Sequence, residues 1–199
     1  MAAKGDAALP PPEALKSKGF TLRGALSFVE SRFGPTSRER IVEEAPPVLR
    51  EVLATPVLAS AWYPFPAQVA LYETLDRVFG RGDLALCREC GRFTAEAEAT
   101  ALHKLILRFA SLEAWLRAAG AMWSQYYSAG RLTTEGFTEG GGRILITDFN
   151  PISRAFCEDL AGWFERTAEL SGKKVTAVVH EACLLTGHPA CVFRAQFRP

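Results

Sequence analysis

Four residues near the C-terminal end have side chains that bind metal ions, and they are Cys157, His180, Cys183 and Cys191. Cysteine thiolates and imidazole nitrogens are the ligands that Zn²⁺ takes in tetrahedral sites. Cys183 and Cys191 flank one short turn built on a glycine, so a hairpin would bring them together. His188, inside this turn, competes with His180 as the fourth ligand. The pattern predicts a zinc site, and the alternative is a set of small buried residues in a compact hairpin.

The position of His180 places a condition on this site. Side chains alternate between the two faces of a strand, and an odd offset separates His180 from Cys183, so regular alternation would point them apart. A bulge or a twist in the strand is therefore needed before both can bind one ion.

Other residues with catalytic potential form no complete motif. Cys87 and Cys90 make a CxxC inside a helical pattern without a second pair at zinc-finger spacing, and we interpret them as two ordinary helix cysteines. The chain contains no HExxH, P-loop, Gly-x-Ser-x-Gly or dinucleotide fingerprint. Asp148, two residues before Asn150-Pro151, is expected to help cap a helix. The sequence thus leans against an enzyme.

The elements that must position the cluster change in type near Gly130. Apolar residues at helical spacing predict helices over about 20–33, 37–45, 67–80, 83–103 and 112–127. Alternating segments then predict strands over 132–138 and 143–149, a helix over 150–172, and strands over 175–183 and 191–197. This order predicts an α+β fold in which a helical N-terminal part packs on an antiparallel sheet, with a ββαββ C-terminal order.

Domain boundaries and helix caps follow from local composition. Residues 1–18, rich in Ala, Pro and Lys, are predicted to be a flexible tail, and 19–199 a single domain. The segment 61–66, aromatic and proline-rich, is interpreted as a stiff connector. Thr36 and Glu39 predict a capping box, and Asn150 is the expected cap of the last helix.

Composition excludes several partners. The chain has 199 residues, 48% of them hydrophobic and 23% charged, with a net charge of +1. This balance shows no electrostatic footprint for nucleic acid, and the apolar runs are too short for a transmembrane segment. The N-terminus lacks the apolar core of a signal peptide, so a cytoplasmic protein with reduced cysteines is expected.

The C-terminal segment FCEDLAGWFERTAELSG…VVHEACLLTGHPACVFRAQF resembles the end of the 4-vinyl-reductase-type domain, which shares a superfamily with TRAPP subunits and the haem-binding H-NOX sensors. The resemblance implies the fold known as NO-signalling/Golgi-transport ligand-binding. In aromatic-responsive activators of this type, three cysteines and an acidic residue hold zinc. Cys157, Cys183 and Cys191 are similar to those cysteines, and His180 or Glu181 would replace the acidic ligand.

The N-terminal half points to the same superfamily. SKGFTLRGALSFVESRFGPTSRERIVEE resembles the opening of H-NOX-like proteins. Together with Trp62-Tyr63-Pro64 and the cysteine hairpin, it also resembles an uncharacterised family of unknown function that is abundant in myxobacteria. His103 lies where a haem sensor could place its axial ligand, but the Tyr-x-Ser-x-Arg motif of H-NOX proteins is incomplete, because Gly130 stands at the arginine position. Zinc is therefore the candidate cofactor, and haem is not expected.

A group of large side chains supplies a candidate ligand site. They lie on or beside one predicted helix and are Phe109, Trp115, Met122, Trp123, Tyr126 and Tyr127. In the sensors that this chain resembles, a small apolar or aromatic ligand lies between helices and sheet. An indole N–H and a phenol hydroxyl would supply the polar contacts that such a pocket needs, whereas the alternative is that the rings simply fill the core.

These observations favour a non-enzymatic regulatory or sensory module that binds a small hydrophobic ligand or a partner protein, with a homodimer implied by the resemblance. An interaction scaffold with a filled core is the alternative. A reductase, suggested only by the name of the domain, and a haem sensor rank below both.

Overall fold

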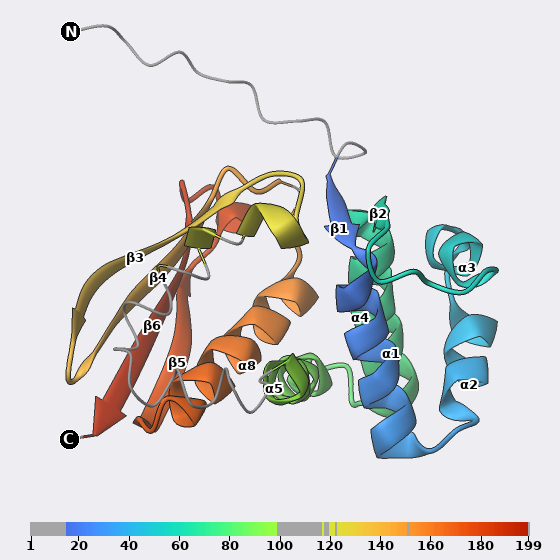
Figure 1. Ribbon diagram of the computed structural model, residues 1–199, viewed down its shortest axis with the longest axis horizontal. Coiled ribbons are helices and arrows are strands. Elements are labelled where there is room, and N and C mark those ends of the chain that lie inside the picture. The colour runs from blue at the N-terminus through green and yellow to red at the C-terminus, as the bar shows by residue number, and fades with distance from the viewer. Residues whose placement is uncertain (1–14, 99–116, 118–119, 122, 151, 199) are drawn as a thin grey trace, which may run out of the picture.

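The computed structural model describes residues 15–98, 117, 120–121, 123–150 and 152–198. A group of N-terminal helices lies beside a C-terminal unit in which one helix packs on a sheet (Figure 1). The helical group contains α1 (Gly19–Phe33), α2 (Ser37–Glu44), α3 (Pro47–Leu53), α4 (Phe65–Phe79) and α5 (Ala85–Glu98). The C-terminal unit contains β3 (Arg131–Thr138), β4 (Gly141–Thr147), α8 (Arg154–Leu170), β5 (Lys174–Ala182) and β6 (Cys191–Arg198).

The sheet has the strand order β3-β4-β6-β5, and every neighbouring pair is antiparallel. β6 alternates regularly: Cys191, Phe193, Ala195 and Phe197 are buried on the side of α8. A half-buried antiparallel sheet produces this period of two. The predicted ββαββ order and the α+β class are confirmed.

The helical group follows the predicted spacing in α1, whose buried face includes Leu22, Leu26 and Val29. The short helix α3 was not predicted, because its seven residues begin at the second of two consecutive prolines, and this pair indicated only a break. In the part of the chain that the structure describes, no helix is both long and apolar enough to cross a bilayer.

Two short strands join segments far apart in the sequence. β1 (Lys16–Lys18) pairs antiparallel with β2 (Trp62–Pro64), and Ser17 also forms a bridge with Tyr127. Folded structure therefore begins within the predicted tail of residues 1–18, where Leu15 is fully buried. The stiff connector predicted over 61–66 likewise contains a strand.

Of the two predicted helix caps, one is wrong and one is right in position only. The cap of α8 is Ser153, whose Oγ accepts a hydrogen bond from the Phe156 backbone N–H at 3.1 Å, so α8 begins after the predicted Asn150. Thr36 occupies the N-cap position of α2 as predicted, but it makes no side-chain cap hydrogen bond, so the capping box does not form. Asp148 instead adopts a φ of 55°, and its carboxylate accepts a hydrogen bond from the Thr147 hydroxyl.

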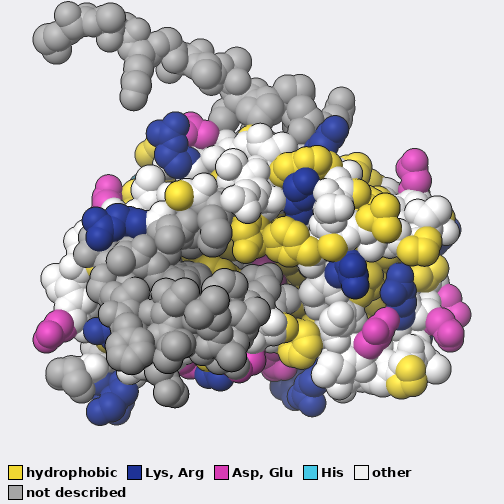
Figure 2. Space-filling view, viewed as in Figure 1, with side chains coloured by type: hydrophobic (Ala, Val, Ile, Leu, Met, Phe, Trp, Pro, Cys, Tyr) yellow, Lys and Arg dark blue, Asp and Glu magenta, His cyan; other side chains and the backbone are white. Residues whose placement is uncertain are grey.

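α5 crosses α8 at very short range, and Figure 1 shows α5 end-on beside α8. Gly91 faces the Asp159 carbonyl and Gly162 faces the Arg88 carbonyl; a Cβ at either glycine would overlap that oxygen. The two glycines thus let the helix backbones touch without side chains between them. On the face drawn in Figure 2, basic and acidic side chains of the described residues are interspersed rather than separated by sign.

Candidate metal site

The structure brings together the four residues that the sequence singled out. The three Sγ atoms of Cys157, Cys183 and Cys191 and a ring nitrogen of His180 all lie within 4.8 Å of one another. The Sγ atoms of Cys157 and Cys191 are 4.0 Å apart, and those of Cys191 and Cys183 are 3.6 Å apart. A tetrahedron with Zn–S bonds of about 2.3 Å has edges of roughly 3.8 Å. The spacing of the sulfurs therefore fits one zinc ion, and the cysteines are free thiols rather than a disulfide.

Three elements supply these side chains. Cys157 extends from the first turns of α8, His180 from β5, and Cys191 from the start of β6. Cys183 follows β5 and begins the short 3-10 turn Leu184–Thr186. Cys157 and Cys191 are buried, so the site lies where the helix meets the end of the sheet.

A β-bulge satisfies the condition that the sequence placed on His180. The pairing of β5 with β6 shifts register between His180, which is opposite Phe193, and Ala182, which is opposite Val192. The extra residue is Glu181. Because a bulge adds one residue to one strand, it restores His180 to the face of the cysteines. The His180 ring stacks on Phe193 with a centroid distance of 4.5 Å and an interplanar angle of 10°.

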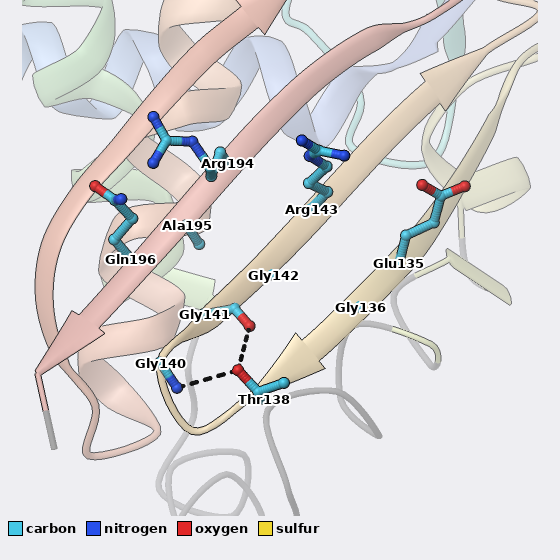
Figure 3. A pocket seen from close by; sticks show the side chains of 10 residues that line it. All are labelled: Glu135, Gly136, Thr138, Gly140, Gly141, Gly142, Arg143, Arg194, Ala195 and Gln196. Carbon is cyan, nitrogen blue, oxygen red and sulfur yellow. Dashed lines mark hydrogen bonds between the residues drawn. The ribbon is translucent and has the colours of Figure 1, made fainter.

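Glu181 is anchored on the opposite face of the sheet. Its carboxylate forms ion pairs with Arg194 and, at 3.5 Å, with Arg143. Figure 3 shows these arginines side by side on neighbouring strands, at a pocket of about 600 Å³ whose lining also includes Glu135 and Gln196. Since Glu181 pairs with both guanidinium groups, they stabilise the bulge, and Glu181 does not replace His180 as a ligand.

The electrostatics of the cluster favour one thiolate. The pKa of Cys191 is lowered, chiefly by a hydrogen bond from the Cys157 thiol, against the opposing effect of burial. The same hydrogen bond, together with burial, raises the pKa of Cys157. Backbone N–H groups of Leu184 and Leu185 point at the sulfurs of Cys191 and Cys183, each at 3.4 Å. Donors of this kind support metal-bound thiolates.

The imidazole of His180 has an unmet requirement. Its Nε2 is buried and has no hydrogen-bond partner among the described residues. A buried polar atom left in this state costs about 1–3 kcal/mol. A ring nitrogen of His180 lies among the three sulfurs, and a hydrogen bond between His180 and Cys191 helps to lower the pKa of that thiol. His188, the competing ligand, has its Nδ1 within 2.8 Å of the Ala190 carbonyl and 3.2 Å of its N–H. His180 is therefore the better fourth donor.

The remaining cysteines lie outside this cluster. Cys87 and Cys90 are fully buried in α5, and the Cys87 thiol donates to the Tyr72 carbonyl at 3.5 Å. Burial raises the pKa of both thiols. They are therefore neutral and packed, as the interpretation of two helix cysteines requires.

The candidate ligand-binding aromatics are only partly described. Phe109, Trp115 and Met122 lie outside the described residues, and Trp123 and Tyr127 are buried. The described rings contact one another in a single cluster of Phe65, Trp123, Tyr127, Phe149 and Phe156. The indole N–H of Trp123 donates to the Ala129 carbonyl at 2.9 Å, so it does not serve as a free polar contact for a ligand. Tyr126 packs edge-on against Phe20.

Sequence reasoning missed the residues that surround the cluster. Ion pairs connect segments that are separated along the chain. Arg88 on α5 pairs with Glu158 and Glu165 on α8. Glu181 on β5 pairs with Arg194 on β6. Only the clustering of arginines and glutamates on two amphipathic helices hinted at such pairs, and spacing along one helix does not reveal partners on another.

Comparison with known proteins identifies the fold. No family model matches the sequence, and no curated protein matches it. The structure is similar to an H-NOX protein from S. oneidensis in the Fe(II)NO ligation state, with a TM-score of 0.70 and 12% identity, covering 92% of this chain and 99% of that one. An unliganded Fe(II) H-NOX protein from K. algicida gives a TM-score of 0.65 at 15% identity, covering 92% and 97%. This chain has the α+β fold of H-NOX proteins.

Proposed function

We propose that this protein is a non-enzymatic regulatory module whose C-terminal unit is held by a structural zinc ion bound to Cys157, His180, Cys183 and Cys191. The observation that carries the proposal is the convergence of four donor atoms within 4.8 Å. Four protein ligands complete a tetrahedral zinc site, whereas catalytic zinc keeps one position open for water or substrate. The donor set thus supports a structural role.

The test is metal analysis of the purified full chain with native mass spectrometry. We expect one zinc per chain, and Cys183→Ser should lose the zinc and unfold at a lower temperature than the wild type by circular dichroism, because structural zinc contributes folding free energy. Cys87→Ser makes the same chemical change at a buried cysteine outside the cluster and should keep the metal. The proposal would be overturned by a wild-type protein that is fully folded without metal and that still binds no zinc when zinc is added. Subunit masses from the same spectra test the homodimer that the resemblance implies.

The signal that this module reads is proposed to be a small hydrophobic or aromatic ligand, bound near Trp123, Tyr126 and Tyr127 with Phe109, Trp115 and Met122. The H-NOX-like fold supports this proposal. A retained small molecule in native spectra that is lost on denaturation would support it further. The dense contacts among the described rings favour a second candidate, a protein-interaction scaffold with a filled core. Absence of any retained or added apolar ligand would favour the scaffold.

The resemblance to H-NOX sensors raises haem as a cofactor, and the segment that carries Tyr126, Ser128 and Gly130 at the Tyr-x-Ser-x-Arg positions supports a module without it. At Gly130, which replaces the motif arginine, a Cβ would lie 2.6 Å from the Phe149 ring and 3.1 Å from Trp123 Nε1. The hydroxyl oxygen of Ser128 accepts a hydrogen bond from the Lys16 N–H at 2.8 Å, within the β1 contact. His103 lies outside the described residues. We therefore propose a module without haem, and a Soret band in protein purified with haem supplied would contradict this.

A further inference from the structure

Arg88 connects the two elements that carry Cys157 and His180. Its guanidinium donates to the Val178 carbonyl on β5 at 2.8 Å, and its Nη1 pairs with Glu158 on α8 at 3.3 Å. Glu158 directly follows Cys157, and Val178 lies one strand repeat before His180. One side chain from a third element thus contacts the neighbours of two candidate ligands.

The contact with β5 falls on the segment that orients His180. β5 is an edge strand, and its pairing with β6 shifts register twice, between Val175 and Ala177 and between His180 and Ala182. The regular segment between these shifts runs from 177 to 180, and Val178 lies within it. A charge-assisted hydrogen bond at this point is a strong constraint on where the segment lies.

The helix crossing fixes the base of the Arg88 side chain. Gly162 of α8 faces the Arg88 carbonyl so closely that a Cβ there would lie 2.9 Å from the Arg88 carbonyl carbon. A further bond, from Arg88 Nε to Glu165 at 3.0 Å, holds the guanidinium against α8. Arg88 is therefore restrained at both ends, and its distances to α8 and β5 depend on each other.

We propose that Arg88 is a positioning residue for the metal site, which sets His180 relative to Cys157 and links α5 to zinc binding; this inference rests on the proposed function. The neighbouring Arg92 provides the comparison. Its side chain is exposed to a similar degree, 33% against 31%, and it pairs with Glu165 at 2.7 Å and Glu169 at 2.9 Å. Both of these partners lie on α8, and the hydrogen bonds and ion pairs that the Arg92 side chain makes with described residues go to α8 rather than to β5.

The experiment compares Arg88→Gln with Arg92→Gln in the full chain. Zinc affinity is measured by competition with a chromophoric chelator, and ligand geometry by the absorption spectrum of the Co²⁺-substituted protein, at a temperature where both variants are folded. We expect Arg88→Gln to weaken zinc binding about tenfold and to change the cobalt spectrum, as loss of outer-shell support does. Arg92→Gln should leave both near wild type, and Arg88→Lys, which keeps a charged donor, should recover part of the affinity.

The outcomes separate the inference from the proposed function. A wild type that binds neither zinc nor cobalt overturns both. A wild type that binds zinc, with Arg88→Gln and Arg92→Gln equal in affinity and spectrum, overturns the inference alone. Should Arg88→Gln not fold, Glu158→Gln removes one of the same contacts from the α8 side. It is expected to weaken zinc binding severalfold, and unchanged affinity in that variant counts against the inference.

Discussion

The crossing of α5 and α8 predicts that Gly162→Ala destabilises the protein. A Cβ at this position would overlap the Arg88 carbonyl oxygen and lie 2.9 Å from its carbon, where ordinary contacts are 3.4 Å or longer. The overlap with the oxygen is the larger of the two, so the helix backbones must separate by about 1 Å or more. Overpacking of this kind costs about 1–3 kcal/mol. The separation also strains the ion pairs that cross the interface.

The same substitution brings one favourable term, because alanine is better than glycine in a helix interior by about 1 kcal/mol. We therefore place the overpacking cost at its upper end and expect a net loss of about 2 kcal/mol. For a chain of this length, 1 kcal/mol lowers Tm by roughly 2–4 °C, so the expected decrease is about 4–8 °C. Thermal and urea unfolding followed by far-ultraviolet circular dichroism measure this.

Gly24→Ala is the matched control, since it gains the same helix propensity in α1. Its Cβ would meet the Thr94 Cγ2 atom at 2.9 Å, which is a contact with a side chain rather than with a helix backbone, so a small shift of Thr94 relieves it. We expect its stability to stay within about 1 kcal/mol of wild type or to increase. If Gly162→Ala proves as stable as Gly24→Ala, the helices are not in backbone contact, and the reasoning about the crossing is wrong.

Two further predictions concern charged residues. Glu181→Gln should weaken zinc binding by a few fold, because the bulge loses its ion pairs, whereas Glu135→Gln on the same sheet face should not; equal chelator-competition curves would contradict this. For Glu169, burial raises the pKa, but hydrogen bonds from Arg92 and Arg166 outweigh it and lower the pKa below its ordinary value of 4.5. Its contribution to stability is thus complete above pH 4.5 and is lost as the pH falls through the folded-state pKa. Urea unfolding of metal-free protein between pH 7 and pH 3 should show a smaller loss of unfolding free energy for Glu169→Gln than for the wild type. Identical losses in the two proteins would refute the assignment to Glu169.

Periodicity predicted the C-terminal unit well, because each of its elements is long enough to repeat its pattern. β6 buries every second side chain over eight residues, and α8 buries one face over seventeen. β1 and β2 are three residues each and pair across more than forty positions, so no local pattern indicates them. A similar limit explains the cap of α8: several residues near its start can accept a hydrogen bond, and the tertiary path of the chain selects Ser153 rather than Asn150.

The candidate site was predictable in its ligands but not in its geometry. Residue types and the hairpin indicated Cys157, Cys183 and Cys191, since a short turn forces the last two together. The choice between His180 and His188 depended on a bulge, and no particular residue type marks a bulge in the sequence. No sequence pattern indicated a role for Arg88, because its hydrogen-bond partners lie about 70 to 90 positions further along the chain.

The bulge at Glu181 makes the ligand set depend on how β5 pairs with β6, and not only on which residues are present. If the same sequence paired regularly through Glu181, the odd offset between His180 and Cys183 would turn the imidazole toward the opposite face. The site would then keep three sulfurs and lose its nitrogen. Removing one residue between His180 and Cys183 would make the offset even, so that regular alternation places both side chains on one face without a bulge. When this hairpin is aligned with that of another protein, a gap of one residue at this point is therefore compatible with the same four ligands.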